Sequence, residues 1–207
     1  MLVYFVRHGE SQGNIAKIHQ PPESPLTPVG LKQAAFIAHR FSSIKIDKII
    51  SSTYQRAAQT AQIISQKIGK DIELSPLVTE WKMPSEIKGK AFDDQQALEI
   101  IKIMRAHDHP NWHYSDEENM YDLQNRADKF LQYLAQHTDE AILITTHSFF
   151  LKILIAVMIF GKDKPSQMLR DWSNSLSSNN TGITLCEYDR EADSWRLITY
   201  NDHSHLG

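Results

Sequence analysis

The chain has 207 residues, 41% of them hydrophobic, which suits one domain or one domain with a modest insertion. A formal net charge of -3 excludes the basic footprint of a nucleic-acid-binding protein, so an anion site must be built locally from a few cations. The single cysteine, Cys186, excludes an internal disulfide and fits a reducing compartment. No signal-peptide pattern follows Met1, and the most apolar stretch, 149–160, is too short to span a bilayer. We therefore expect a cytoplasmic protein with no membrane partner.

Short apolar runs alternate with helical patterns along the N-terminal half of the chain. Runs rich in β-forming residues predict strands at 2–6, 47–51 and 72–74. The polar segment 7–20 contains Gly9 and Gly13 and predicts a loop. A helix is predicted from about 53 to 67, with its end near Gly69.

The helix between the first two strands is marked by its N-terminus. Thr27 is a good N-cap, and Pro28 suits the first helical position. Apolar residues then recur with helical spacing, which predicts one buried face. Its expected members are Leu31, Ala34, Ala35, Ala38 and Phe41.

The C-terminal half continues the alternation. Residues 80–94 hold Pro84, Gly89 and mixed charge, which predicts an irregular segment. Helical patterns predict further helices at about 94–107, 118–137 and 149–160. The apolar run 141–145 predicts a buried strand, and 182–188 with 195–200 predicts a hairpin. Strands that alternate with helices predict an α/β fold with a mostly parallel sheet.

Two of the predicted strands are followed directly by histidine, in Arg7-His8 and in Thr146-His147. Ligands of such folds bind beyond the carboxyl ends of the strands, so we expect His8 and His147 to converge. Arg56 comes just after the second strand, in the first turns of a helix. Arginine can bind two phosphoryl oxygens and keeps its charge, and a neutral imidazole can attack phosphorus. These residues predict phosphoryl transfer without a metal, with His8 as nucleophile.

The segments that carry these residues resemble the histidine phosphatase superfamily, the phosphoglycerate-mutase-like proteins. Four blocks occur in the family's order: Arg7-His8-Gly9-Glu10-Ser11 with Asn14, Pro25-Leu26-Thr27 with Gly30, Ser51-Ser52 with Arg56-Ala57, and Thr146-His147-Ser148. The resemblance covers about residues 2–188, which is a whole domain. A lone Arg-His-Gly is a weak signal, whereas four ordered blocks at strand ends are a specific one.

The resemblance implies a single domain, 1–207, folded as a three-layer α/β/α sandwich with a mostly parallel central sheet. It implies that His8 becomes phosphorylated and that a carboxylic acid protonates the leaving group and then activates water. Glu80 is the expected acid and Glu86 is its rival, because the segment after Glu80 departs from the family's usual run. The residues expected to hold the phosphoryl oxygens are Arg7, Arg56 and His147. Further phosphate or substrate contacts are expected from Asn14, Gln20 and Ser148.

The favoured function is a phosphomonoesterase acting on a small phosphorylated metabolite, because the segment between Glu80 and His147 has the length of the compact phosphatases. A phosphoglycerate-type mutase and a non-catalytic phospho-ligand binding protein are the alternatives. An inserted segment at about 81–125 is expected to cap the substrate. No cofactor, metal or nucleic-acid partner is expected, and both a monomer and a homodimer stay open. His107, His109 and His113 are expected to face solvent, since no cysteine or helical His-x-x-x-His pattern accompanies them.

Overall fold

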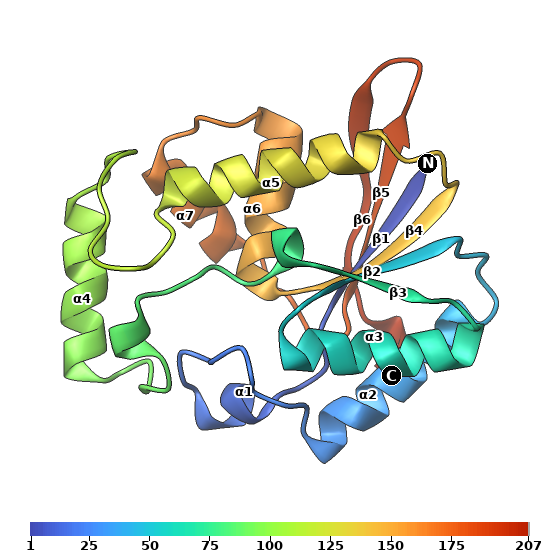
Figure 1. Cartoon of the computed structure of the whole chain (residues 1–207), viewed down its shortest axis with the longest axis horizontal. Helices are drawn as coiled ribbons and strands as arrows, with labels where there is room; N and C mark the ends of the chain where they lie inside the picture. The colour runs from blue at the N-terminus through green and yellow to red at the C-terminus, as the bar shows by residue number, and fades with distance from the viewer. Residues whose placement is uncertain (207) are drawn as a thin grey trace.

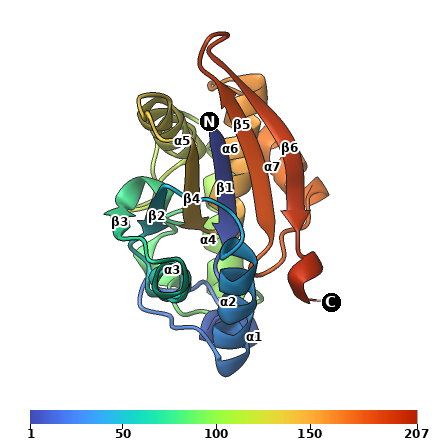
Figure 2. The same cartoon turned by 90° about the vertical axis from the view of Figure 1, so that its right-hand side faces the viewer.

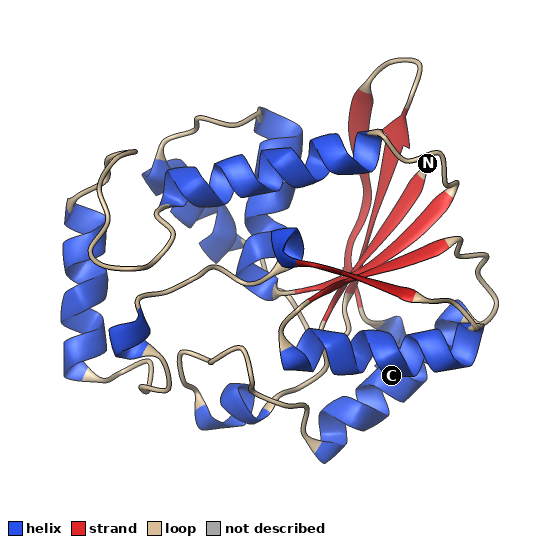
Figure 3. Cartoon of the chain, viewed as in Figure 1, coloured by secondary structure: helices blue, strands red, loops and turns tan. Residues whose placement is uncertain are grey.

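The computed structural model describes residues 1–206 and contains one mixed sheet (Figure 1 and Figure 3). Its strands are β1 Leu2–Arg7, β2 Lys48–Ser52, β3 Ile72–Ser75, β4 Ala141–Thr146, β5 Ile183–Asp189 and β6 Ser194–Asp202. They lie in the order β3-β2-β4-β1-β5-β6, with β1, β2, β3 and β4 mutually parallel. The antiparallel pairs β1/β5 and β5/β6 add the predicted hairpin at one edge.

Helices cover both faces of this sheet. The helices of the described chain are α1 Gln12–Ala16, α2 Pro28–Phe41, α3 Gln55–Ile68, α4 Gln95–Ala106, α5 Met120–Ala135, α6 Ser148–Phe160 and α7 Ser166–Ser175, with 3-10 turns η1 Pro76–Val78, η2 Ser85–Ile87 and η3 Ser204–Leu206. One core cluster joins α2 and α3 to the sheet, and another joins α5, α6 and α7 to its opposite face. The predicted three-layer α/β/α sandwich is therefore confirmed, and the C-terminal turn η3 lies beside α2 (Figure 2).

The strand positions follow from burial. Every residue of β4 is buried, as expected for a central parallel strand whose two faces are both covered by helices. The helix α6 is also apolar around most of its circumference, because it packs between the sheet, α5 and α7. No helix within residues 1–206 is long and apolar enough to cross a membrane.

Two helices do not follow from the sequence pattern. The loop predicted over 7–20 is wrong at Gln12–Ala16, which form α1. This helix has only 5 residues and depends on a reciprocal capping box between Ser11 and Asn14, so no apolar periodicity announces it. The helix α7 lies in a segment for which no element was predicted.

The predicted buried face of α2 is partly wrong. Leu31 is 44% exposed and Ala35 is also exposed, whereas Ile37 is fully buried. The inward position of the first turn is occupied instead by Gly30, where an added Cβ would lie 2.0 Å from the carbonyl oxygen of Glu10. The backbone that follows β1 thus passes too close to α2 for any side chain.

This close approach clamps the loop that carries His8. The Thr27 backbone N–H donates to the Glu10 carbonyl at 2.9 Å, and the Thr27 hydroxyl donates to the Glu10 carboxylate at 2.7 Å. The Glu10 N–H donates in turn to the Gln33 side chain at 2.8 Å. The first turn of α2 therefore fixes the conformation of the chain immediately after His8.

We expect Gly30→Ala to lower the free energy of unfolding by about 2 kcal/mol, because the added methyl group overpacks the site. At a helix position with open space, a Gly→Ala substitution would instead raise the free energy of unfolding by up to about 1 kcal/mol. Gly69→Ala is the matched control, because Gly69 ends α3 at φ 69° with open space around it. Gly69→Ala should lower the free energy of unfolding by about 1 kcal/mol, because only the left-handed backbone conformation opposes the added side chain. Urea unfolding of both variants measures the difference, and a stabilised Gly30→Ala variant would contradict the close approach.

Candidate active site

Parallel pairing brings the carboxyl ends of β1, β4 and β2 to one edge of the sheet. Arg7 is in register with Thr146, and the His8 backbone N–H donates to the Thr146 carbonyl at 3.0 Å. His147 follows β4 directly, and its ring centroid lies 5.1 Å from that of His8. The structure thus brings together the two histidines that follow these strand ends.

His8 is buried, and two hydrogen bonds select one tautomer of its ring. Its Nδ1 lies 2.7 Å from the Gly9 carbonyl oxygen, which only accepts, so Nδ1 carries the proton. Its Nε2 accepts a hydrogen bond from Arg56 Nε at 3.2 Å. Burial lowers the pKa of His8 well below 6.5, and the charges of Arg56 and Arg7 lower it further. The ring is therefore neutral at pH 7, with its lone pair on Nε2.

Two buried guanidinium groups accompany His8. Arg7 ends β1 and donates to the Ser178 carbonyl, and its Nε is buried with no hydrogen-bond partner among residues 1–206. Arg56 lies in the first turn of α3 and donates to the Pro21 carbonyl at 3.2 Å. Burial lowers the pKa of both arginines, and the negative charge of Glu80 opposes that shift. Both keep their charge at pH 7, because arginine does not deprotonate in proteins.

His147 is fully buried beside these groups. Its Nε2 lies 2.7 Å from the hydroxyl of Ser52, the last residue of β2, and its Nδ1 has no hydrogen-bond partner in the described part of the chain. Burial lowers the pKa of His147 well below 6.5, with Arg56 adding to the shift. His147 Nδ1 and Arg7 Nε are thus buried polar atoms without protein partners. Each such atom costs about 1–3 kcal/mol, and a phosphoryl group with three oxygens could satisfy both.

Glu80 lines the same pocket and is held by backbone donors. Its Oε1 accepts from Trp81 N and from Phe150 N, both at 2.9 Å, and its Oε2 accepts from Phe149 N at 3.2 Å. Phe149 and Phe150 belong to the first turn of α6, so the carboxylate lies at the N-terminus of the helix that His147 caps. The carboxylate therefore has one defined orientation in the pocket.

The rival carboxylate, Glu86, has a different environment. It is exposed on η2, accepts a hydrogen bond from the Ser115 hydroxyl at 2.9 Å, and is not part of the pocket lining. Glu80 is further secured by Arg126, which the sequence did not single out and which donates to the Thr79 carbonyl at 2.9 Å and the Glu80 carbonyl at 3.3 Å. The geometry therefore favours Glu80 over Glu86 as a group that can reach a ligand beside His8.

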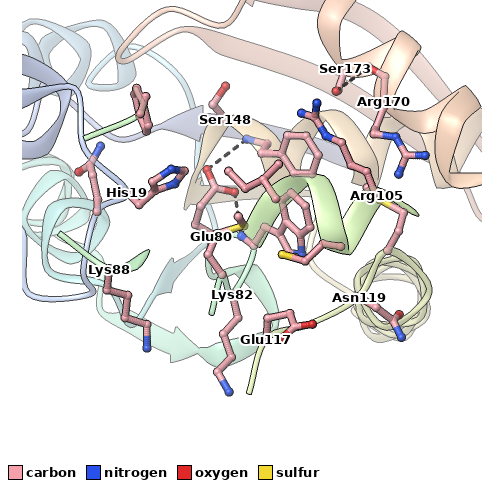
Figure 4. Close-up of a pocket in the computed structure, with 18 of the residues that line it drawn as sticks. His19, Glu80, Lys82, Lys88, Arg105, Glu117, Asn119, Ser148, Arg170 and Ser173 are labelled. Carbon is pink, nitrogen blue, oxygen red and sulfur yellow. Dashed lines mark hydrogen bonds between the residues drawn. The ribbon is translucent and has the colours of Figure 1, made fainter. Parts of the chain in front are cut away.

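Asn14 and Gln20 also line the pocket, where their side-chain oxygens face Ser11. The Ser11 hydroxyl lies 2.9 Å from Asn14 Oδ1 and 2.7 Å from Gln20 Oε1, and Asn14 Oδ1 also accepts from Asn180 Nδ2 at 3.3 Å. Since the oxygens are engaged, the amino groups are the ends that could donate to a ligand. Ser148 lines the pocket from the first position of α6 (Figure 4).

The cavity that these residues line has a volume of about 560 Å³ and extends well beyond the histidines. Its outer wall includes Trp81 and Phe149, whose rings stack at 4.8 Å. His19, which the sequence also did not single out, points into the pocket in Figure 4, and its buried Nε2 has no partner within 1–206. The signal for it was present, since His19 directly precedes Gln20 in a loop already expected to bind substrate.

The histidines near 107–113 are exposed, as expected. His107 stacks on Trp112 at 4.6 Å, and His113 Nε2 lies 2.7 Å from an Asp122 carboxylate oxygen. No group of three or more His, Cys, Asp or Glu side chains in the described chain could hold a metal ion.

Comparisons with known proteins place this chain in a family. Residues 3–203 match the model of the histidine phosphatase superfamily (branch 1). A probable phosphoglycerate mutase GpmB of Proteus mirabilis is 30% identical over an alignment of 209 residues, which covers 99% of this chain and 94% of that protein.

Solved structures agree on the fold. YhfR of Bacillus stearothermophilus superposes with a TM-score of 0.84 and 26% identity, over 100% of this chain and 99% of that one. A mutant phosphoserine phosphatase of Entamoeba histolytica, in complex with phosphoserine, superposes with a TM-score of 0.79 and 22% identity, over 99% of this chain and 98% of that one. With a family model that matches nearly its whole length, the chain belongs to branch 1 of the histidine phosphatase superfamily.

Proposed function

We propose that the chain is a phosphomonoesterase, which transfers the phosphoryl group of a small phosphorylated metabolite to His8 and then to water. The observation that carries this proposal is the neutral His8 ring, with its Nε2 lone pair beside Arg56 and with Arg7 and His147 close by. This arrangement supplies a nucleophile together with fixed donors for the charge on the phosphoryl oxygens.

In the first step, the entering phosphoryl group replaces the hydrogen bond between Arg56 Nε and His8 Nε2 with one from Arg56 to a phosphoryl oxygen. His8 Nε2 then forms a bond to phosphorus as the bond from phosphorus to the ester oxygen breaks. The Glu80 carboxylate takes up a proton as the negative charge of the substrate enters beside it, and it gives this proton to the leaving oxygen. The Gly9 carbonyl, which lies 2.7 Å from Nδ1, stabilises the proton on the now cationic ring.

In the second step, the Glu80 carboxylate takes a proton from water as the water oxygen attacks phosphorus. The bond between phosphorus and His8 Nε2 breaks, phosphate leaves, and both His8 and Glu80 return to their starting forms. Residues 81–125, which supply Trp81 and much of the outer wall, cap the substrate during both steps.

A phosphoglycerate-type mutase is the second candidate, because the GpmB relative carries that name at 30% identity. A mutase shares the first step but returns the phosphoryl group to a second hydroxyl. Arg7, His8, Arg56 and Glu80 line one pocket, with His147 buried directly beside His8, and this complete set opposes a third reading, a non-catalytic phosphate-binding protein.

We expect the purified protein to release phosphate from p-nitrophenyl phosphate in the presence of EDTA, and from members of a phosphorylated metabolite panel. His8→Ala should lower kcat/KM by about 10⁴-fold or more, because the nucleophile is lost. His39→Ala, which removes an exposed histidine of α2, is the matched control and should leave activity unchanged.

Retained turnover in His8→Ala would remove His8 as nucleophile, and strong inhibition by EDTA would show that the reaction needs a metal. Interconversion of phosphoglycerates without phosphate release, in a parallel mutase assay, would replace the phosphatase with the mutase. A similar melting temperature of wild type and His8→Ala excludes unfolding as the cause of lost activity.

Glu80→Gln should lower kcat about 10²–10⁴-fold on an alkyl phosphate such as phosphoserine, because an alkoxide needs a proton in order to leave. The loss on p-nitrophenyl phosphate should be much smaller, since p-nitrophenolate leaves without one. Glu86→Gln should match wild type on both esters, because Glu86 is exposed on η2, outside the pocket. Loss of activity only in Glu86→Gln would reverse the assignment.

The pKa of His8 should lie far enough below 6.5 that its ring stays neutral at pH 6, because burial and two arginines oppose its protonation. The unfolded chain takes up this proton near pH 6.5, so His8 lowers folding stability as the pH falls below 6.5 and has no such effect above it. NMR of the His8 Cε1–H resonance, assigned by its disappearance in His8→Asn, should show no titration between pH 8 and 6. A midpoint near 6.5 would contradict the neutral nucleophile at lower pH.

A further inference from the structure

Two arginines that the chemistry above does not use line the pocket on one side. Arg105 lies in the last turn of α4, and Arg170 lies in α7. Figure 4 shows both side chains on the side of the pocket where Ser173 lies, across from His19 and Lys88. The two helices belong to distant parts of the chain, so the fold itself places both side chains on the wall of one pocket.

The protein matches these two charges incompletely. Arg105 is exposed, and within residues 1–206 its guanidinium makes no hydrogen bond or ion pair with the protein. The Arg170 side chain is only 19% exposed, yet its nearest carboxylate, Asp108, lies 3.9 Å away, and its contacts with Gln167 Oε1 are 3.3 and 3.4 Å long. Asp108 also accepts a hydrogen bond from the Ser166 hydroxyl. The pocket wall therefore carries one exposed guanidinium without a protein partner, Arg105, and one largely covered guanidinium with a single long ion pair, Arg170.

Structural roles account for these arginines only in part. A cation in the last turn of a helix is stabilised by the helix dipole, which explains Arg105 on α4. Arg170 lies in the middle of α7, where the dipole gives no such stabilisation. A largely covered guanidinium with one long ion pair is unfavourable unless a further anion binds it.

The rest of the outer pocket is mainly apolar and is far larger than a phosphoryl group needs. Its apolar members include Trp81, Met83, Ile101, Met104 and Phe149. A cavity of about 560 Å³ with such walls suits a ligand with a sizeable organic group. The pocket therefore offers cationic groups beside His8, an apolar wall, and two more cations at Arg105 and Arg170.

We propose that Arg105 and Arg170 form a second anion subsite, which binds a carboxylate or phosphate carried by the organic group of the substrate. Planar guanidinium forks bind either group through paired N–H donors. The inference rests on the proposed function in that His8 takes the phosphoryl group of the same molecule. The substrate class is a phosphomonoester with a second anionic group on an apolar or aromatic spacer.

Three aryl phosphates of similar shape test this subsite: 4-carbamoylphenyl phosphate, 4-carboxyphenyl phosphate and 1,4-phenylene bisphosphate. Wild type should turn over at least one of the two anionic esters with a kcat/KM about tenfold above the neutral amide, chiefly through KM, as a charge-assisted hydrogen bond allows. The better of the two anionic esters identifies the carboxylate or the phosphate as the preferred group.

Arg105→Ala and Arg170→Ala should each remove most of this advantage and change turnover of the neutral amide by less than about twofold, since they lose only the anion contact. Lys102→Ala is the matched control, because it removes a positive charge from α4 at an exposed position that pairs with Glu99 outside the pocket lining. It should keep the full advantage.

Equal kcat/KM for all three esters, or an advantage that survives both arginine substitutions, would overturn the subsite and leave the phosphatase intact. Absence of turnover with every ester would instead overturn the proposed function. In that case calorimetry tests the subsite. At least one of the two anionic esters should bind wild type with a lower Kd than the neutral amide, and the arginine variants should lose this difference. Equal Kd values for all three would overturn it there as well.

Discussion

The site depends on the parallel pairing of β1 with β4. Arg7 lies opposite Thr146, and the His8 N–H extends the ladder to the Thr146 carbonyl, so both strands end at the same level. A shift of one residue in this register would turn His147 toward the other face of the sheet. Because β2 pairs with the opposite side of β4, its last residue, Ser52, contacts His147, and the first turn of α3 then places Arg56 in reach of His8. Backbone pairing of the strands thus brings the residues of the site together from three distant segments.

This convergence produces a pocket whose charges are not balanced by the protein. Arg7 and Arg56 are anchored through the carbonyl oxygens of Ser178 and Pro21 rather than through carboxylates, which leaves their charge available. Burial keeps His8 and His147 neutral by lowering the pKa of each, so neither adds to the repulsion between the arginines at pH 7. The donors are therefore positioned before any ligand arrives, and little reorganisation is needed when charge develops on a phosphoryl group.

The sequence predicted the features that depend on strand ends and on helical periodicity. It missed the features that depend on tertiary contacts. Placing Arg7, His8 and His147 at one edge required only the strand order of a parallel sheet. Glu80 and Glu86 could not be separated, because both lie in an irregular segment where only packing against α6 shows which one is inside. The predicted buried face of α2 was wrong at Leu31, because Gly30 occupies the first inward position and an apolar pattern does not register a glycine that is buried by backbone contact.

The two parts of the pocket are also supported differently. His8 and His147 stand at the ends of buried central strands, whereas α4, which carries Arg105, packs on η2 through a separate small cluster of Ile87, Ala97 and Ile100. Side chains on α4 can therefore change with little effect on the geometry around His8.

A phosphohistidine is common to a phosphatase and a mutase, so the outcome depends on whether water or a substrate hydroxyl lies beside Glu80 when the phosphoryl group leaves His8. In the proposed mechanism the outer wall controls that choice, because it determines how the organic group of the substrate lies in the pocket after the first step.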